Sequence, residues 1–384
     1  MARIKRRFTN VYHRTIHEKA LDWLVNLFAA YDDLDDPDDI DAFDEEILRA
    51  MDDVEQTAPV QIGPFENPIT WETITPQHCL KLTGLDRLTI ATIADHLIPD
   101  QRVATHRGRS SVPRRDAILV LTAVLRNPGF RWRLTDELQM HEDRLSRIAR
   151  SAALYLKFKW AKVLSWPKRL VRRRVREYTR AVRRRFRRTG IHLRCTVAGF
   201  IDCHIRRTCR PVRMQRALWT RFKRCHGLKV QTVALPDGIM CASRAFAARV
   251  HDYTLMRKTR ICRRVARDLD GARLASDGGY QTNGQILRTP PNCPQFSATR
   301  VLVEWIHDDI MKMWPALEFK RFQRVLLTIP AAFYAAAVIL RNAVVCVSGH
   351  GGQVAGACRL QPPQLAELFD HRDALPVFAA DLSH

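Results

Sequence analysis

Three carboxylates stand in phrases whose residue types could do chemistry. Asp202 closes the apolar run of FIDC, Asp277 stands in LASDGGY, and Glu304 stands in RVLVEW. Asp and Glu supply the hard oxygen ligands that Mg²⁺ and Mn²⁺ prefer. Two such ions, held about 3.5 to 4 Å apart, clamp the attacking and leaving oxygens of a phosphoryl displacement. The trio therefore predicts one pocket of metal ligands suited to breaking a phosphodiester bond.

The elements around these carboxylates must bring them together. CTVAGFID alternates like a strand, and HGLKVQTVALPDGIMCASRAFAA reads as two strands joined by Pro236, Asp237 and Gly238. One amphipathic helix is expected from Asp252, then a short strand ending at Asp277. SATRVLVEWIHDDIMKMWPAL is expected to be a helix that turns Glu304 toward the sheet edge. This order is that of a ribonuclease H-like α/β fold, with a mixed sheet flanked by helices.

The segment before this core reads as helical. RRDAILVLTAVLRNPGF is expected to form a helix that stops at Asn127, Pro128 and Gly129. A second pair of helices follows, with Thr135 as a plausible N-cap. Two helices around a short turn are compatible with a helix-turn-helix that enters a major groove, and equally with plain helical packing. The sequence leaves these two readings open.

Charge marks the remaining boundaries. YDDLDDPDDIDAFDEEILRAMDDVEQ is strongly acidic, which favours a mobile, solvated arm. The predicted layout has five parts: an acidic arm (1–60), a helical domain (61–166), an Arg-rich segment (167–190), the ribonuclease H-like nuclease domain (191–349) and a C-terminal tail (350–384). With 384 residues, 46% of them hydrophobic, the chain is long enough for two folded units.

The formal net charge of +23 favours a polyanionic partner. The Arg-rich run KRLVRRRVREYTRAVRRRFRR, from Lys168 to Arg188, repels itself unless an acidic partner neutralises it. We expect a helix or extended arm that contacts nucleic-acid phosphates or serves as a nuclear-import address; a solvated helical face is the alternative. The phosphate contacts are expected from Arg172, Arg173, Arg174, Arg183, Arg184 and Arg185.

Composition argues against secretion and against a metal-thiolate site. No run of about eighteen uninterrupted apolar residues occurs, and MARIKRRFTNVYHR lacks the apolar middle of a secretory signal, so an intracellular protein without membrane contact is expected. The ten cysteines form no CxxC and are expected to be reduced, structural thiols. Cys203 and Cys209 with His204 and His226 form a cluster in the sequence, but their spacing fits no standard zinc site.

Several phrases together resemble a known family. GFIDCHIRRTCRP, RFKRCHGLKVQTVALPDGI, VHDYTLM, LASDGGY, RVLVEW and AAVILRNAVVCV resemble the DDE domain of the PIF/Harbinger superfamily of transposases and their domesticated relatives. The resemblance runs from about Ala117 through Gly349. It implies that Asp202, Asp277 and Glu304 are the first, second and third ligands of two Mg²⁺ or Mn²⁺ ions. Asp252 of VHD is either a further metal ligand or the N-cap of the helix that follows, with His251 beside it.

The resemblance also implies partners and an activity. Arg210 (followed by Pro211), Lys223, His226 and Lys229 match basic family positions and would act as electrostatic clamps near a scissile phosphate. The implied activity is cut-and-paste DNA transposition: hydrolysis at the element's terminal repeats, then attack of a freed 3′-hydroxyl on target DNA. Family members often act with a separate Myb-like DNA-binding protein, so such a partner, a nuclear location and a homo-oligomer are expectations here.

Three departures from the family pattern keep other functions open. His307 and Asp308 replace the usual Phe-Gly, the segment from Tyr280 to Arg300 is short, and AFAAR precedes His251. Asp308, at i+4 from Glu304, would either join the metal site or repel that carboxylate. One alternative is a catalytically silent nuclear DNA-binding or protein-interaction relative. Another is an RNA-processing ribonuclease H-like enzyme, which explains fold and charge but not VHD or RVLVEW.

Overall fold

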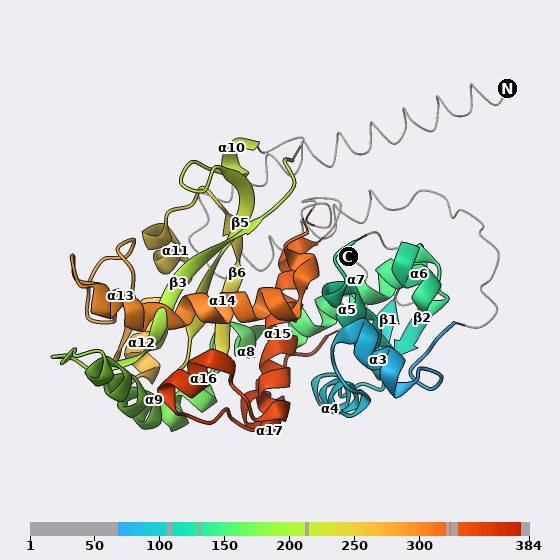
Figure 1. Ribbon diagram of the computed structural model, residues 1–384, viewed down its shortest axis with the longest axis horizontal. Helices are drawn as coiled ribbons and strands as arrows, with labels where there is room; N and C mark the ends of the chain where they lie inside the picture. The colour runs from blue at the N-terminus through green and yellow to red at the C-terminus, as the bar shows by residue number, and fades with distance from the viewer. Residues whose placement is uncertain are drawn as a thin grey trace.

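A computed structural model describes residues 68–377, apart from 106–109, 130–131, 212–214, 320–322 and 324–328. The predicted acidic arm, 1–60, lies outside the described residues. Figure 1 shows a helical part built from the first described elements on one side and a mixed sheet with its covering helices on the other. This arrangement confirms the predicted α/β architecture, a curled mixed sheet flanked by helices of the ribonuclease H-like type.

The helical part follows the apolar periodicity of the sequence. Its elements are α3 (Pro76–Thr83), α4 (Arg87–Leu97), the hairpin β1 (Arg102–Thr105) and β2 (Ser110–Pro113), α5 (Arg114–Arg126), α6 (Trp132–Leu138), α7 (Glu142–Lys159) and α8 (Ala161–Ser165). α5 stops at its C-cap Asn127, directly before Pro128, as predicted. α6 starts at Trp132, so Thr135 lies inside the helix and its prediction as N-cap is wrong.

The second helix of the possible helix-turn-helix is largely internal. In α7, the consecutive residues from Ser151 to Leu156 are all buried, and the helix packs against α5 and α15. A recognition helix must present a face to the major groove. The burial of α7 on every side over this stretch therefore favours plain helical packing, the other reading that the sequence left open.

The Arg-rich run is one amphipathic helix, α9 (Lys168–Arg188). Apolar residues at helical spacing, from Leu170 through Tyr178 to Phe186, are buried and pack along β3. Phe186 reaches the aromatic rings of Phe200 on β3 and Phe296 on α13, with centroids 6.3 and 4.9 Å apart. The core thus holds one face of the helix, and the arginines take the other positions.

The six-stranded sheet has the strand order β4-β5-β3-β7-β8, and β6 also pairs with β5. Its strands are β3 (Val197–Arg207), β5 (Cys225–Ala234), β6 (Met240–Ala247), β7 (Arg273–Ser276) and β8 (Ile286–Arg288); α10 (Gln215–Leu218) and the short β4 (Trp219–Thr220) precede β5. β5 pairs antiparallel with β3 and with β6, as the sequence predicts. β7 pairs in parallel with β3. The turn between β5 and β6 places Gly238 at φ +86°, and a Cβ there would collide with the backbone of Gly351.

Two predicted helices are each divided. The segment from Asp252 forms α11 (Asp252–Lys258) and α12 (Ile261–Asp268), because Arg260 between them adopts a left-handed φ of 51°. The segment before and after Glu304 forms α13 (Pro294–Arg300) and α14 (Leu302–Met313), followed by η2 (Pro315–Leu317). Glu304 lies in the first turn of α14.

Helix α15 (Pro330–Ser348) stands between the helical part and the sheet (Figure 1). It packs against α4 and α7 on one side and β6 on the other, where the Asn342 amide exchanges hydrogen bonds of 2.7 and 3.1 Å with the backbone of Met240. By length and composition alone α15 could cross a membrane, but 72% of its apolar window is buried within the protein, which is typical of a core helix.

The segment predicted as the C-terminal tail forms short helices within its described residues, which end at 377. It contains α16 (Gly352–Cys358), α17 (Leu365–Leu368) and η3 (His371–Asp373). The reason is packing: Phe369 is buried with its ring 5.2 Å from that of Trp160, and Leu375 N donates to Lys159 O at 2.8 Å.

Candidate active site

Two of the predicted carboxylates lie on neighbouring parallel strands. Asp202 lies within β3, opposite Thr232 of β5, rather than at the strand's end, and Asp277 directly follows β7. β3 and β7 run side by side with Phe200 paired to Ala275. Because both aspartates come two residues after this pair, the sheet itself brings them to the same level of adjacent strands.

Asp252 joins them from the start of α11. Its Oδ2 lies 3.0 Å, and the Oδ1 of Asp277 3.3 Å, from the position that a Cβ on Gly279 would occupy. Gly279 N donates to Asp277 Oδ1 at 2.9 Å and so fixes that carboxylate. The absence of a side chain at Gly279 leaves the space in which the two carboxylates face each other. Asp252 is not the N-cap of α11; His251 holds that position and accepts from Tyr253 N.

Burial and neighbouring negative charge act on the Asp202 carboxyl. Burial, then the nearby charge of Asp277 and more weakly that of Asp252, raises its pKa to about 6, against the opposing effects of Arg300 and the Cys203 N–H. Its side chain is only 16% exposed. A carboxylate that is desolvated and surrounded by like charge binds a cation strongly, since the cation relieves both penalties.

Glu304 is connected to Asp202 through Arg300. The Arg300 guanidinium donates from Nη2 to Glu304 Oε1 at 2.7 Å and from Nη1 to Asp202 Oδ2 at 3.2 Å. Glu304 is the exposed member, with 51% of its side chain accessible, whereas Arg300 is 13% exposed. A positive charge therefore stands between the first and third predicted metal ligands.

A second protein cation neutralises Asp252. The ammonium of Lys229 donates to Asp252 Oδ1 at 2.8 Å and to Val250 O at 2.6 Å, and its side chain is 10% exposed. Lys229 thus reaches the site from inside the sheet. The sequence predicts that Lys229 contacts DNA. In the structure its ammonium is instead bound to Val250 and Asp252.

The departures near Glu304 have separate environments. His307 is buried and its Nε2 forms a 2.8 Å hydrogen bond with Thr232 Oγ1, which also donates to the backbone oxygen of Asp202. Its ring lies 4.3 Å from that of His204. Asp308 is exposed. His307 therefore supports β3 from behind the site, while Asp308 lies on the solvent side of α14.

The carboxylates fit a hard divalent cation by their chemistry. Among the residues that the structure describes, no three His, Cys, Asp or Glu side chains are already gathered closely enough to hold a metal ion. However, the guanidinium between Asp202 and Glu304 shows that their geometry accommodates a positive charge there. Asp202, Asp277 and Glu304 would hold the metal once Arg300 turned away, and carboxylate oxygens are the ligands that Mg²⁺ and Mn²⁺ favour.

The remaining predicted basic residues divide into paired and unpaired groups. Arg172 contacts Asp268 at 2.6 Å and Arg173 contacts Glu367 at 3.1 Å, while Arg174 contacts the fully buried Asp237 at 2.8 Å. Arg183 and Arg184 are exposed, and Arg185 is half-buried. Arg210 is exposed and binds the side chain of Gln215, Lys223 is exposed, and His226 lies against Trp219 with ring centroids 4.9 Å apart.

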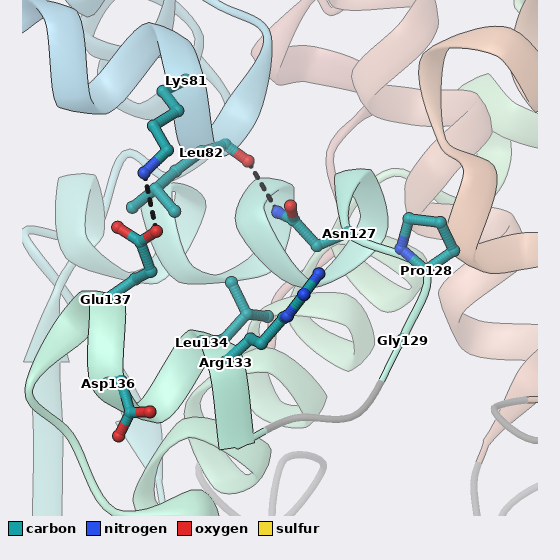
Figure 2. A pocket seen from close by; sticks show the side chains of 9 residues that line it. All are labelled: Lys81, Leu82, Asn127, Pro128, Gly129, Arg133, Leu134, Asp136 and Glu137. Carbon is teal, nitrogen blue, oxygen red and sulfur yellow. Dashed lines mark hydrogen bonds and ion pairs between the residues drawn. The ribbon is translucent and has the colours of Figure 1, made fainter.

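The hollow drawn in Figure 2 lies away from these carboxylates. It has a volume of about 870 Å³ and is lined by residues of the helical part, including Lys81, Asn127 and Glu137. Lys81 Nζ pairs with Glu137 Oε1 at 2.7 Å, and Asn127 Nδ2 donates to Leu82 O at 2.8 Å. These polar groups use one another or the backbone as hydrogen-bond partners. None of the predicted site residues lines the hollow, so it is separate from the candidate active site at the sheet.

Arg300 is the site residue that the sequence analysis did not identify. Its spacing of four residues before Glu304 is a recognisable signal, since oppositely charged residues at i and i+4 pair on a helix. The contact with Asp202, 98 residues away in the chain, depends on the fold and carried no such signal.

All ten cysteines lie in described segments, and none of them forms a disulfide. The Cys203 thiol contacts the Tyr280 hydroxyl at 3.1 Å.

A mixed sheet with one aspartate on β3, another directly after the parallel neighbour β7 and a glutamate on a later helix is the arrangement of a ribonuclease H-like core. Residues 201–342 match the family model of the DDE superfamily endonucleases. The matched range contains Asp202, Asp252, Asp277 and Glu304 and ends inside α15, so it supports a DDE transposase-like nuclease. A comparison with curated proteins gave no match, and neither did a comparison with solved structures.

Proposed function

We propose that this protein is a metal-dependent DDE transposase of the PIF/Harbinger type, which hydrolyses DNA and then transfers the freed strand. The observation that carries the proposal is the convergence of Asp202 and Asp277 on adjacent strands, with Arg300 linking Asp202 to Glu304. Asp202, Asp277 and Glu304 are the proposed ligands, and Asp252 is a further candidate from the start of α11.

Each carboxylate has a distinct part in this chemistry. Asp202, Asp277 and Glu304 would hold Mg²⁺ or Mn²⁺, which would activate the attacking oxygen and stabilise the leaving one. Asp202 would bind from within β3 and Asp277 from directly after β7, so the sheet would fix the centre with little entropic loss. Glu304 binds from the exposed first turn of α14, where substrate has access. The same centre serves hydrolysis and strand transfer, because both are in-line displacements at phosphorus.

DNA is the proposed substrate, and the part of α9 from Arg176 to its end, termed its second half, is the proposed binding surface. The exposed arginines Arg176, Arg180, Arg183, Arg184, Arg187 and Arg188 have no ion pair within the described part of the chain. Unpaired arginines on one helix neutralise phosphates and release counterions, which favours binding without reading the bases.

This half of α9 ends beside the site. Its C-cap Thr189 contacts Thr299 with hydroxyl oxygens 3.0 Å apart, and Thr299 directly precedes Arg300. Phosphates bound along the helix would therefore lead toward the carboxylates. The first half of α9 is different, because Arg169, Arg172, Arg173 and Arg174 each contact an acidic side chain of the protein. The proposed surface excludes that half.

Cleavage of the terminal repeats of the source element by the purified full chain, in Mg²⁺ or Mn²⁺, tests the proposal. Asp202→Asn should abolish cleavage and leave DNA binding intact, because it removes a metal ligand and no phosphate contact. Equal loss of binding and cleavage would indicate misfolding, and cleavage by the variant would overturn the assignment. A nuclear location, a Myb-like DNA-binding partner and a homo-oligomer are further parts of this proposal, to be tested with the native protein.

A catalytically silent DNA-binding relative is the second candidate. One observation favours it: Arg300 already neutralises two of the three proposed ligands. In such a protein the divalent metal would bind no more tightly to the full chain than to Asp202→Asn. A metal titration of these two proteins therefore separates the candidates before any substrate is known.

A further inference from the structure

The hairpin between β4 and β5 exposes aromatic residues that the fold does not use. Among the described residues, the exposed large hydrophobic side chains are Leu80, Leu88, Trp219 and Phe222. Two of these four stand at this one hairpin, where Phe222 is 84% and Trp219 38% exposed. Phe222 occupies the turn itself, so packing in the core does not explain its apolar surface.

Cations surround this aromatic residue. Arg221, Lys223 and Arg224 are all exposed beside Phe222, and the ammonium of Lys223 lies 5.0 Å from the Phe222 ring centroid. Below the turn, Trp219 pairs with His226 across the two strands and contacts its ring. The pairing of β4 with β5 thus holds the turn in place. The tip of the hairpin presents the Phe222 ring next to three positively charged side chains.

This combination fits a nucleobase and its phosphates better than it fits a protein surface. Arginine and lysine at the tip bind a polyanion, and an aromatic ring stacks on any base, since every base has a π-face. Paired bases inside a duplex have no free face. Base faces become accessible at a DNA end, at a nick, or at a step that an inserted apolar side chain opens.

The hairpin lies at the far end of the strands that carry the site. Asp202 pairs with Thr232 on β5, and the β4 pairing occupies the first residues of the same strand, Cys225 and His226. Seven residues of strand correspond to roughly 23 Å at about 3.3 Å per residue. Figure 1 shows this end of β5, next to α10, extending beyond the helices that cover the sheet. A bound duplex can span that distance.

We propose that the hairpin tip, Trp219–Arg224, is a base-stacking element in which Phe222 stacks on an unpaired or end-exposed DNA base while Arg221, Lys223 and Arg224 hold the adjoining phosphates. The inference rests on the proposed function insofar as DNA is the ligand. It adds a contact to the bases themselves, which the α9 surface does not provide.

The test uses the full chain in metal-free buffer and a short duplex whose single-stranded overhang contains 2-aminopurine. Fluorescence of this base is quenched when an aromatic ring stacks on it, so binding should change the emission. Phe222→Ala should remove the quenching and weaken binding to the overhang DNA roughly tenfold, with a smaller loss for a blunt duplex. Phe222→Trp should restore both signals, whereas Phe222→Leu should restore neither fully, because stacking and not apolar area is required.

Leu88→Ala is the matched control, since Leu88 is a 77% exposed apolar residue on α4 away from this surface. It should leave both signals unchanged. Wild type and Phe222→Ala could bind DNA equally, with a salt dependence but without any change in 2-aminopurine emission. This result would overturn the stacking role and leave the proposed function standing. Absence of DNA binding by all proteins would instead overturn the proposed function. If Phe222→Ala converted a dimer into a monomer in sedimentation and left emission unchanged, the tip would be a protein interface.

Discussion

Arg300 and Asp202 are joined by a 3.2 Å hydrogen bond between Nη1 and Oδ2, although 98 residues separate them in the chain. The same guanidinium binds Glu304. Arg300 takes one oxygen of each carboxylate and places a positive charge between them. A divalent metal held by Asp202 and Glu304 would therefore compete with Arg300 for these carboxylates.

Replacing Arg300 should strengthen metal binding. Arg300→Gln removes the competing cation and leaves the carboxylates in place, so Mn²⁺ affinity by calorimetric titration should rise roughly tenfold. Arg176→Gln is the control, because it removes one positive charge from an exposed position of α9. Equal affinities for all three proteins would show that Arg300 does not compete with the metal.

His307 should make the stability of the fold depend on pH. Burial, together with the nearby His204 and Arg206, lowers the pKa of His307 well below its ordinary 6.5. Below about pH 6.5 His307 binds a proton in the unfolded chain but not in the folded chain. The free energy of unfolding is therefore full above that pH and falls on acidification, by about 1.4 kcal/mol per pH unit. His307→Gln removes this contribution, and its free energy of unfolding in urea should fall less between about pH 7.5 and 5.5. Parallel pH profiles for the two proteins would contradict this account.

Arg174 should matter for stability rather than for DNA. Its Nη1 contacts Asp237 Oδ2 at 2.8 Å, and Asp237 is fully buried, where the Tyr178 hydroxyl also donates to it at 2.7 Å. Arg174→Met leaves a buried carboxylate without its cation, which costs about 3 to 5 kcal/mol. Urea unfolding measures this loss, and Arg180→Met, at an exposed site of the same helix, should change stability by less than about 0.5 kcal/mol. A loss of similar size in both variants would disprove the structural role.

The two halves of α9 should differ in their effect on salt dependence. Replacing Arg183, Arg184 and Arg187 by Gln should flatten the slope of log affinity against log salt by about 0.9 for each phosphate contact removed. The matched triple Arg169, Arg172 and Arg173 to Gln should lower thermal stability with little change in that slope, because those arginines already pair with acids. Equal slopes in the two triples would show that the whole helix binds DNA uniformly, or that none of it does.

The strands that carry the carboxylates could be predicted because their signals are local. Alternating β-branched residues define β3, and the residues from Pro236 to Gly238 define the β5–β6 turn. The neighbouring position of Asp202 and Asp277 followed only from the ribonuclease H-like order of elements, and the parallel pairing of β3 with β7 produces it in the structure. Where sequence and topology agree in this way, the site follows from the fold.

The features that sequence reasoning missed depend on distant partners. Arg174 is chemically the same as its neighbours in the run, and only Asp237, 63 residues later, makes it internal. The division of α11 from α12 occurs at Arg260, a residue type that gives no turn signal, in a left-handed conformation. Lys229 likewise reads as a surface cation until Val250 and Asp252 enclose it.

The position of α15 has a consequence for the order of events during synthesis. α4 and α7 are complete once Lys159 has been made, but the helix that covers them is not complete until Ser348. At about 5 to 20 residues per second, this interval lasts roughly 10 to 40 s. Throughout it the nascent helical part lacks the helix that covers its apolar face, so we expect this face to be open to chaperones or to aggregation until α15 emerges from the ribosome.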